Sequence, residues 1–86
     1  MADKTFQFRL VTPQGKLIDA AATYASVPAH DGSIGFLPNR APIVFKLGKG
    51  KLEVELADGG KSFKIADGFG QMVDNRLTIL TTKAEA

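Results

Sequence analysis

Apolar and polar residues alternate with a period of two along several short segments of the chain. Near the start, Phe6, Phe8 and Leu10 are separated by single polar residues. Successive side chains of a strand point to opposite faces, so this pattern predicts a half-buried β-strand. The sequence TPQG at residues 12–15 favours a turn, because it combines proline and glycine. A second short strand is expected over Gly15–Asp19.

A third strand is expected around Val27. Pro28 is expected to end it, because proline has no amide donor for the sheet. A loop over residues 29–32 should follow. Two short apolar segments, 34–37 and 43–47, lie close to prolines and predict further short buried strands.

The second half of the chain predicts two β-hairpins. Residues 51–56, KLEVEL, alternate in polarity, a turn of Asp-Gly-Gly follows at 58–60, and the alternation resumes in SFKI at 62–65. A second hairpin should join Phe69–Val73 to Arg76–Thr82 through an Asp-Asn turn, since both residues accept left-handed backbone conformations.

These segments predict an all-β fold. Apolar residues do not recur at helical spacing between proper caps, and the strands come roughly every 8 to 12 residues, which is typical of a sandwich or barrel. We expect a flattened antiparallel β-sandwich or barrel of about 8–10 short strands in two sheets. A chain of 86 residues suffices for a single domain over residues 1–86. The alternation places Phe6, Phe8, Phe63 and Phe69 on the core face.

Composition is that of an ordinary folded domain, with 44% apolar and 23% charged residues. The chain has no cysteine, which excludes disulfides and thiolate metal sites. It has no apolar run of the ~20 residues that cross a bilayer and no secretion signal, so we expect a soluble, intracellular protein. The net charge is only +2, and acidic residues interleave with the densest basic stretch, so a polyanion partner is weakly supported. The lysines of that stretch are Lys46, Lys49, Lys51, Lys61 and Lys64.

Candidate chemistry is sparse. Residues 59–62, GGKS, imitate the end of a phosphate-binding loop, but Glu55 occupies the place of its first glycine. His30 is the only histidine, so a solvated loop residue is favoured over a metal ligand. No serine has a nucleophile-elbow context. We therefore expect a non-enzymatic protein without a cofactor or metal. The alternative function is a small nucleic-acid-binding β-barrel, which would need its aromatic residues exposed for base stacking.

The most distinctive segment is DGSIGFLPNRAP at residues 31–42, a shaped loop around an apolar centre. Such loops often present a binding surface, although a sandwich corner without a partner is an equal alternative on composition alone. The longer run VPAHDGSIGFLPNRAPIV closely resembles the signature of the ATP synthase ε subunit N-terminal domain. Similarity continues in FRLVTPQGKLI and ADGFGQMVDNRLTIL, so it spans nearly the whole chain. The signature positions are filled by Asp31, Gly32, Ile34, Gly35, Phe36, Leu37, Pro38, Ala41 and Pro42.

The resemblance implies a two-sheet sandwich in the rotor of an F-type ATP synthase, at the cytoplasmic face of the bacterial inner membrane. This module would bind the γ subunit and the polar loops of the c-ring, and so couple proton-driven rotation to ATP synthesis without catalysis of its own. The positions that match γ-facing residues are Thr12, Arg40 and Phe45. The positions that match the c-ring-facing loop are Asp31, Gly32, Ser33 and Ile34. The apolar contact with γ is expected to use Phe36, Leu37, Ile43 or Phe45, whichever face outward.

Three residues depart from the family pattern. Ser33 stands where relatives often have a carboxylate, Arg40 where many have histidine, and Asp67 at the first glycine of a common pair. Arg40 gives a permanently charged, planar donor in place of a titratable one. Typical relatives also continue into a C-terminal helical hairpin, which is expected to be absent here. Without that hairpin, neither nucleotide binding nor autoinhibition can be assigned from the sequence, whether the short length is natural or the chain has been trimmed.

Overall fold

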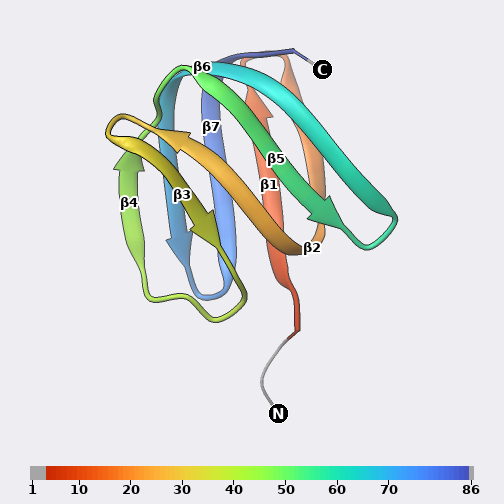
Figure 1. The fold of residues 1–86 in the computed structure, drawn as a ribbon. Helices are drawn as coiled ribbons and strands as arrows, with labels where there is room; N and C mark the ends of the chain where they lie inside the picture. Colours follow the sequence, from red (N-terminus) through yellow and green to blue (C-terminus); the bar gives the residue numbers. More distant parts are fainter. Residues whose placement is uncertain (1–3, 86) are drawn as a thin grey trace.

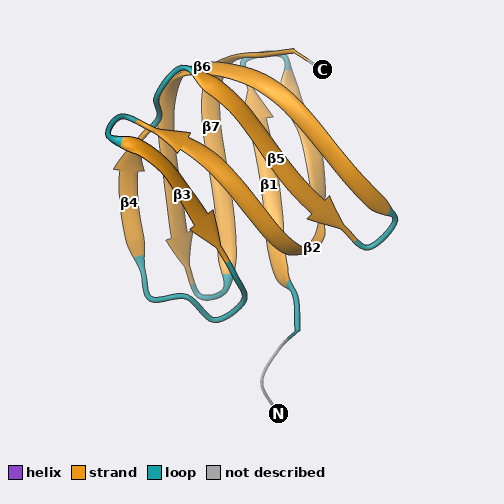
Figure 2. Ribbon diagram, in the orientation of Figure 1, coloured by secondary structure: helices purple, strands orange, loops and turns teal. Residues whose placement is uncertain are grey.

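The computed structural model describes residues 4–85, and every regular element in this range is a β-strand (Figure 2). The all-β class is therefore confirmed. The strands are fewer and longer than expected, because β2 and β6 each run for 15 residues and each covers two of the predicted short strands. The described strands are β1 (Phe6–Thr12), β2 (Gly15–Ala29), β3 (Gly32–Phe36), β4 (Ile43–Lys46), β5 (Gly50–Leu56), β6 (Gly59–Val73) and β7 (Arg76–Glu85).

The strands form two layers that share the long strands β2 and β6 (Figure 1). One layer contains β4, the second half of β6, β7, β1 and the first half of β2. The other contains β3, the second half of β2, β5 and the first half of β6. Pairing runs in the order β1-β7-β6-β5-β2-β3, and β1 also pairs with β2, which closes a ring.

The sheet is mixed, and this corrects the expectation of a purely antiparallel sandwich. The β1–β7 pair is parallel, whereas the other pairs are antiparallel. β1 and β7 are the first and last described strands, so no hairpin connection requires them to be antiparallel. Antiparallel order holds where strands follow one another through short turns, as in the β6–β7 hairpin. There Asp74 and Asn75 have φ values of 52° and 60°, which confirms the predicted tight turn.

Pro28 does not end its strand, contrary to expectation. β2 continues to Ala29, and Pro28 lies opposite Ser33 in the β2–β3 hairpin. Hydrogen-bonded and non-hydrogen-bonded pairs alternate along an antiparallel ladder, and the Ala29–Gly32 pair next to the two-residue turn is of the first kind. The backbone of Pro28 therefore faces away from β3, where its carbonyl accepts a 2.9 Å hydrogen bond from the Gly48 N–H. No β2–β3 hydrogen bond is lost.

β6 is irregular at Asp67 and Gly68. The β6–β7 register is the same before and after this segment, since Ala66 pairs with Lys83 and Gly68 with Thr81, but Asp67 itself is not paired. Asp67 has a φ of 57° and Gly68 a φ of 133°. The buried Thr81 hydroxyl lies 2.9 Å from the Ala66 carbonyl oxygen and 2.8 Å from that of Asp67. Its single proton is donated to one of these carbonyl groups at a time, so the Thr81 side chain anchors β7 to the irregular segment of β6.

The irregular segment at Asp67 and Gly68 changes the face to which alternate residues point. Ile65 is buried before this segment, whereas Phe69 after it is 59% exposed. The expectation that Phe69 belongs to the core is therefore wrong, because two successive residues with positive φ interrupt the regular alternation of the strand. Phe6 and Phe8 are fully buried as predicted, and Phe63 is half-buried against the core.

The hydrophobic core fills the space between the two layers. Its largest fully buried side chains come from every strand except β4, and they include the aromatic rings of β1 and β3. These buried side chains are Phe6, Phe8, Phe36, Leu10, Leu52, Met72, Leu77, Ile79, Val27 and Val54.

Among residues 4–85 there is no helix with the length and hydropathy that crossing a bilayer requires.

Candidate interaction surface

Exposed apolar side chains gather on the outer side of the layer that contains β4, β6, β7 and β1. Val44 is 67% exposed, Phe69 59% and Leu80 52%. Phe69 lies directly opposite Leu80, and Leu80 also lies beside Val11 of β1. Val44 lies opposite Gln71, two residues beyond Phe69 on the same side of β6. We call the surface formed by Val11, Val44, Phe69 and Leu80 the apolar face.

The apolar face is uneven. Hollows of about 180 and 360 Å³ are both lined by Phe69 and Leu80, and the larger one extends to Thr12 and Pro13. A contiguous exposed apolar patch on a small domain often marks a site where another protein binds. The sequence pattern missed Phe69 because the alternation is interrupted at Asp67 and Gly68. This pair inside an otherwise alternating segment was the available signal, since Asp-Gly favours a turn or another irregularity of the backbone.

Thr12, predicted to face γ, borders the apolar face but is largely buried, with 8% exposure. Its hydroxyl accepts a hydrogen bond from the Gln14 N–H at 3.3 Å and lies 3.3 Å from the Gly15 carbonyl oxygen. This arrangement fixes the turn between β1 and β2. Thr12 therefore contributes to the shape of the surface more than to its exposed area.

Arg40 and Phe45, also predicted to face γ, are joined through Phe36. The Arg40 guanidinium donates a 3.2 Å hydrogen bond to the Gly35 carbonyl and lies 5.1 Å from the centre of the Phe36 ring. The Phe36 and Phe45 rings stack with centroids 5.4 Å apart. These three side chains hold together the edge strands β3 and β4. Thr12, at the end of β1, is at the opposite end of the sandwich from the β3–β4 loop that carries Arg40 (Figure 1).

The predicted c-ring-facing residues form one hairpin tip. Asp31, Gly32 and Ser33 are exposed, and Ile34 is half-buried. A hollow of about 440 Å³ separates this tip from β4 and is also lined by Phe45. The predicted c-ring loop and two of the three predicted γ-facing residues are thus close to the β3–β4 edge, whereas Thr12 is not.

The residues considered for metal or phosphate chemistry have other places in the fold. His30 is exposed in the β2–β3 turn, and its backbone N–H donates a 2.9 Å hydrogen bond to the Lys46 carbonyl. Gly59–Ser62 opens β6 in a hairpin, so no helix N-terminus follows that would hold a phosphate. Within residues 4–85 no group of three side chains that commonly bind metals lies together.

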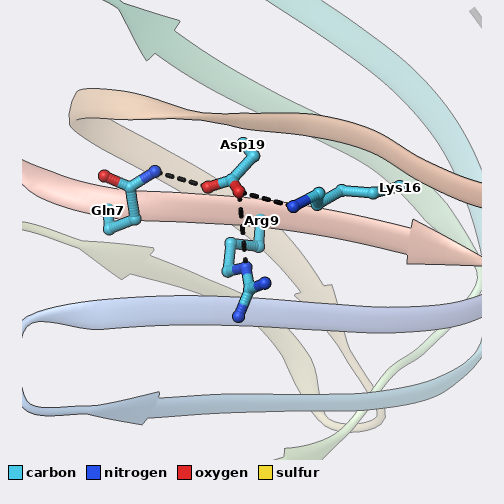
Figure 3. Close-up of polar contacts among 4 residues, drawn as sticks. All are labelled: Gln7, Arg9, Lys16 and Asp19. Carbon is cyan, nitrogen blue, oxygen red and sulfur yellow. Dashed lines mark hydrogen bonds and ion pairs between the residues drawn. The ribbon is translucent and has the colours of Figure 1, made fainter.

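A polar cluster lies on the outer side of the β1–β2 pair (Figure 3). The Asp19 carboxylate accepts a 2.8 Å hydrogen bond from Lys16 Nζ and a 2.5 Å hydrogen bond from Gln7 Nε2. Arg9 Nε lies 3.8 Å from the same carboxylate. The hydrogen bond from Lys16, followed by that from Gln7, holds the pKa of Asp19 below its ordinary value. The cluster is open to solvent, so its contribution to stability is small.

This cluster gives a pH-dependent prediction. Because the folded-state pKa of Asp19 is lowered, its bonds stabilise the fold above the unfolded pKa of about 4 and are lost as the pH falls through the folded value. We expect Asp19→Asn to lower the Tm slightly at pH 7, and this difference from the unmodified protein should shrink as the pH falls through the lowered pKa, because the native carboxyl then becomes neutral as well. Thermal denaturation followed by circular dichroism at a series of pH values measures the difference. A loss of Tm that does not depend on pH would contradict the assignment.

The fold and the apolar face together define a small β-sandwich interaction module. The chain belongs to the family described as ATP synthase, Delta/Epsilon chain, beta-sandwich domain, whose model matches residues 5–86. The resemblance found in the sequence is thereby confirmed.

Relatives and solved structures agree with this membership. The ATP synthase epsilon chain of Pelotomaculum thermopropionicum is 36% identical, over 99% of this chain and 63% of its own length. That of Koribacter versatilis is 34% identical, over 99% of this chain and 59% of its own. This chain therefore spans about 60% of the relatives that it matches. A chain of the Euglena gracilis mitochondrial ATP synthase has the same fold, with a TM-score of 0.89 at 22% identity, over 98% of this chain and 54% of that one.

Proposed function

We propose that this chain is the β-sandwich of an F-type ATP synthase ε subunit and acts as a non-catalytic part of the rotor. In this role it binds the γ subunit and the c-ring and helps to pass proton-driven rotation to the sites of ATP synthesis. The proposal rests on one observation above the others. A domain that matches the epsilon-chain family over residues 5–86 presents a contiguous apolar face to solvent.

The apolar face is the proposed contact with γ. Burial of Phe69, Leu80 and Val44 would remove exposed apolar area from water, and aromatic residues at the centre of an interface commonly supply most of its affinity. Thr12 lines one end of this surface, beside Phe69 and Leu80. Phe45 follows Val44 in β4 but packs against the core and stacks on Phe36. Arg40 and Phe45 would therefore contact γ at the β3–β4 edge, and Thr12 at the border of the apolar face.

The hairpin tip at residues 31–34 is the proposed contact with the c-ring. It is exposed and polar, and it offers the Asp31 carboxylate and the Ser33 hydroxyl to a polar ring loop. With serine in place of the more common carboxylate, hydrogen bonds would replace one ionic contact. In this assembly the chain would be held at the cytoplasmic face of the bacterial inner membrane through its partners, as one domain and without a cofactor.

A capture experiment tests the proposed function. We expect the purified 86-residue chain to retain the γ subunit and the c-ring of its own organism in a pull-down. Arg40→Glu should weaken γ binding about tenfold, because it reverses a charge that also positions Phe36 at the β3–β4 edge.

Lys61→Glu is the matched control. It makes the same charge change on β6 at a residue that lines neither the apolar face nor the hairpin tip, and it should leave the affinity for γ unchanged. If the unmodified chain captures no γ subunit, the rotor function is wrong.

A further inference from the structure

A basic hollow of about 380 Å³ lies where neighbouring segments of β5, β6 and β7 meet, away from the apolar face. We call it the lysine hollow. Four lysines surround it and one glutamate adjoins them, so its lining carries a net charge of +3. Between the lysines the floor is apolar. The lining residues are Lys49, Gly50, Lys51, Lys64, Ile65, Ala66, Lys83 and Glu85.

The strand register brings like charges together in the lysine hollow. Lys51 of β5 lies directly opposite Lys64 of β6. Like charges at directly opposite positions destabilise a sheet. On its other side Lys64 is opposite Glu85, but the ion pairs found within residues 4–85 all involve Asp19. Neither Lys51 nor Lys64 forms an ion pair with another of the residues that the structure describes.

The fold also separates charges that are interleaved in the sequence. Glu53 and Glu55 lie further along β5, toward the β5–β6 turn that contains Asp58, and none of the three lines the hollow. Lys83 instead joins the cluster from β7, 19 residues beyond Lys64 in sequence. The weak basic signal in the sequence thus becomes a local concentration of positive charge at one place.

We propose that the lysine hollow binds a compact phosphate anion with several negative charges, of the class of inorganic pyrophosphate and tripolyphosphate. Lysine binds phosphate as a point charge, and a bound anion would relieve the repulsion between Lys51 and Lys64. The four lysines come from different segments and line the same hollow. A compact anion fits this arrangement better than an extended acidic peptide, which would require charges along a line. The site is independent of the proposed rotor function.

The test is a calorimetric titration of the 86-residue chain with pyrophosphate at physiological ionic strength, where weak surface attraction is screened. We expect saturable 1:1 binding. The double variant Lys51→Gln/Lys64→Gln should weaken it at least tenfold. The control Lys4→Gln/Lys61→Gln removes the same two charges outside the hollow and should change the affinity less than twofold.

A second variant separates binding from folding. Lys51→Glu places an opposite charge across from Lys64, so the protein should be at least as thermostable as before while losing pyrophosphate binding. Three outcomes would overturn the proposal. The first is no binding at about 1 mM pyrophosphate, and the second is an equal loss of affinity in the two double variants. The third is tighter binding of a glutamate peptide through the same lysines, which would indicate an acidic protein segment as the ligand.

Discussion

Gly68→Ala is expected to destabilise the domain by about 4 kcal/mol, a large part of the total stability of a domain of this size. A Cβ atom at this position would lie 2.0 Å from the Leu80 carbonyl oxygen and 2.9 Å from Thr81 Cα. Both are backbone atoms of the paired strand β7, so a side-chain rotation cannot relieve the contact. The φ of 133° adds a second cost, because residues with a Cβ rarely adopt it.

Gly59→Ala provides the comparison that separates the two costs. Gly59 has a similar φ of 129°, but a Cβ there would have no neighbour within 4 Å. We expect this variant to lose only about 1 kcal/mol, from the backbone conformation alone. Urea denaturation measures the free energy of unfolding of both variants. If the two losses are equal, the close approach of β6 to β7 at Gly68 has been assigned too much weight.

The local alternation of residues was sufficient to predict the strands that are regular. Phe6, Phe8 and Leu10 are buried as the pattern indicates, and so are Leu52 and Val54. Such strands are predictable because a half-buried strand in a small sandwich imposes its period directly on the sequence. The prediction failed where a residue that usually ends a strand is accommodated instead. The two examples are a proline at a position that needs no amide donor and the pair Asp67 and Gly68, whose positive φ values interrupt the alternation of β6.

The closure of the sandwich could not be predicted from local pattern. β1 and β7 pair in parallel although they stand at opposite ends of the described chain, and this brings Val11 beside Leu80. Nothing in either segment alone specifies that neighbour. The grouping of Lys83 with Lys64 has the same origin, since it depends on the β6–β7 register. The resemblance named Arg40 and Phe45, which the structure joins through Phe36 at the β3–β4 edge, and their contact with γ stays a prediction. The apolar face became visible only once the strands were paired.

The irregular segment of β6 connects the stability of the domain to its proposed binding surface. Without the positive φ values at Asp67 and Gly68, regular alternation from Ile65 would place Phe69 inside and Gly70 outside. Gly70 instead lies under the Phe45 ring, where a Cβ would come within 2.2 Å of the ring's Cζ atom. The outward position of Phe69 and the inward position of Gly70 therefore have one cause. A glycine at residue 68 allows this backbone conformation, which turns an aromatic side chain toward solvent.

Phe69→Ser is therefore expected to weaken γ binding about 100-fold, if γ docks on the apolar face as proposed, because a central aromatic residue often dominates the energy of an interface. Since 59% of Phe69 is already exposed, the free energy of unfolding should change by less than about 1 kcal/mol. Calorimetric titration with γ and urea denaturation measure the two quantities.

Tyr24→Ser is the matched control for Phe69→Ser. Tyr24 is also an exposed aromatic residue, 41% exposed, but it lies opposite Glu55 in the other layer and should not contact γ. Equal losses of affinity in the two variants would show that the effect does not come from the apolar face. Full retention of γ binding by Phe69→Ser would place the contact elsewhere on the sandwich, most simply at the β3–β4 edge, because Arg40 and the hairpin tip are the other predicted contacts. The pair of variants thus distinguishes a wrong docking face from a wrong function, which capture of γ by the unmodified chain tests separately.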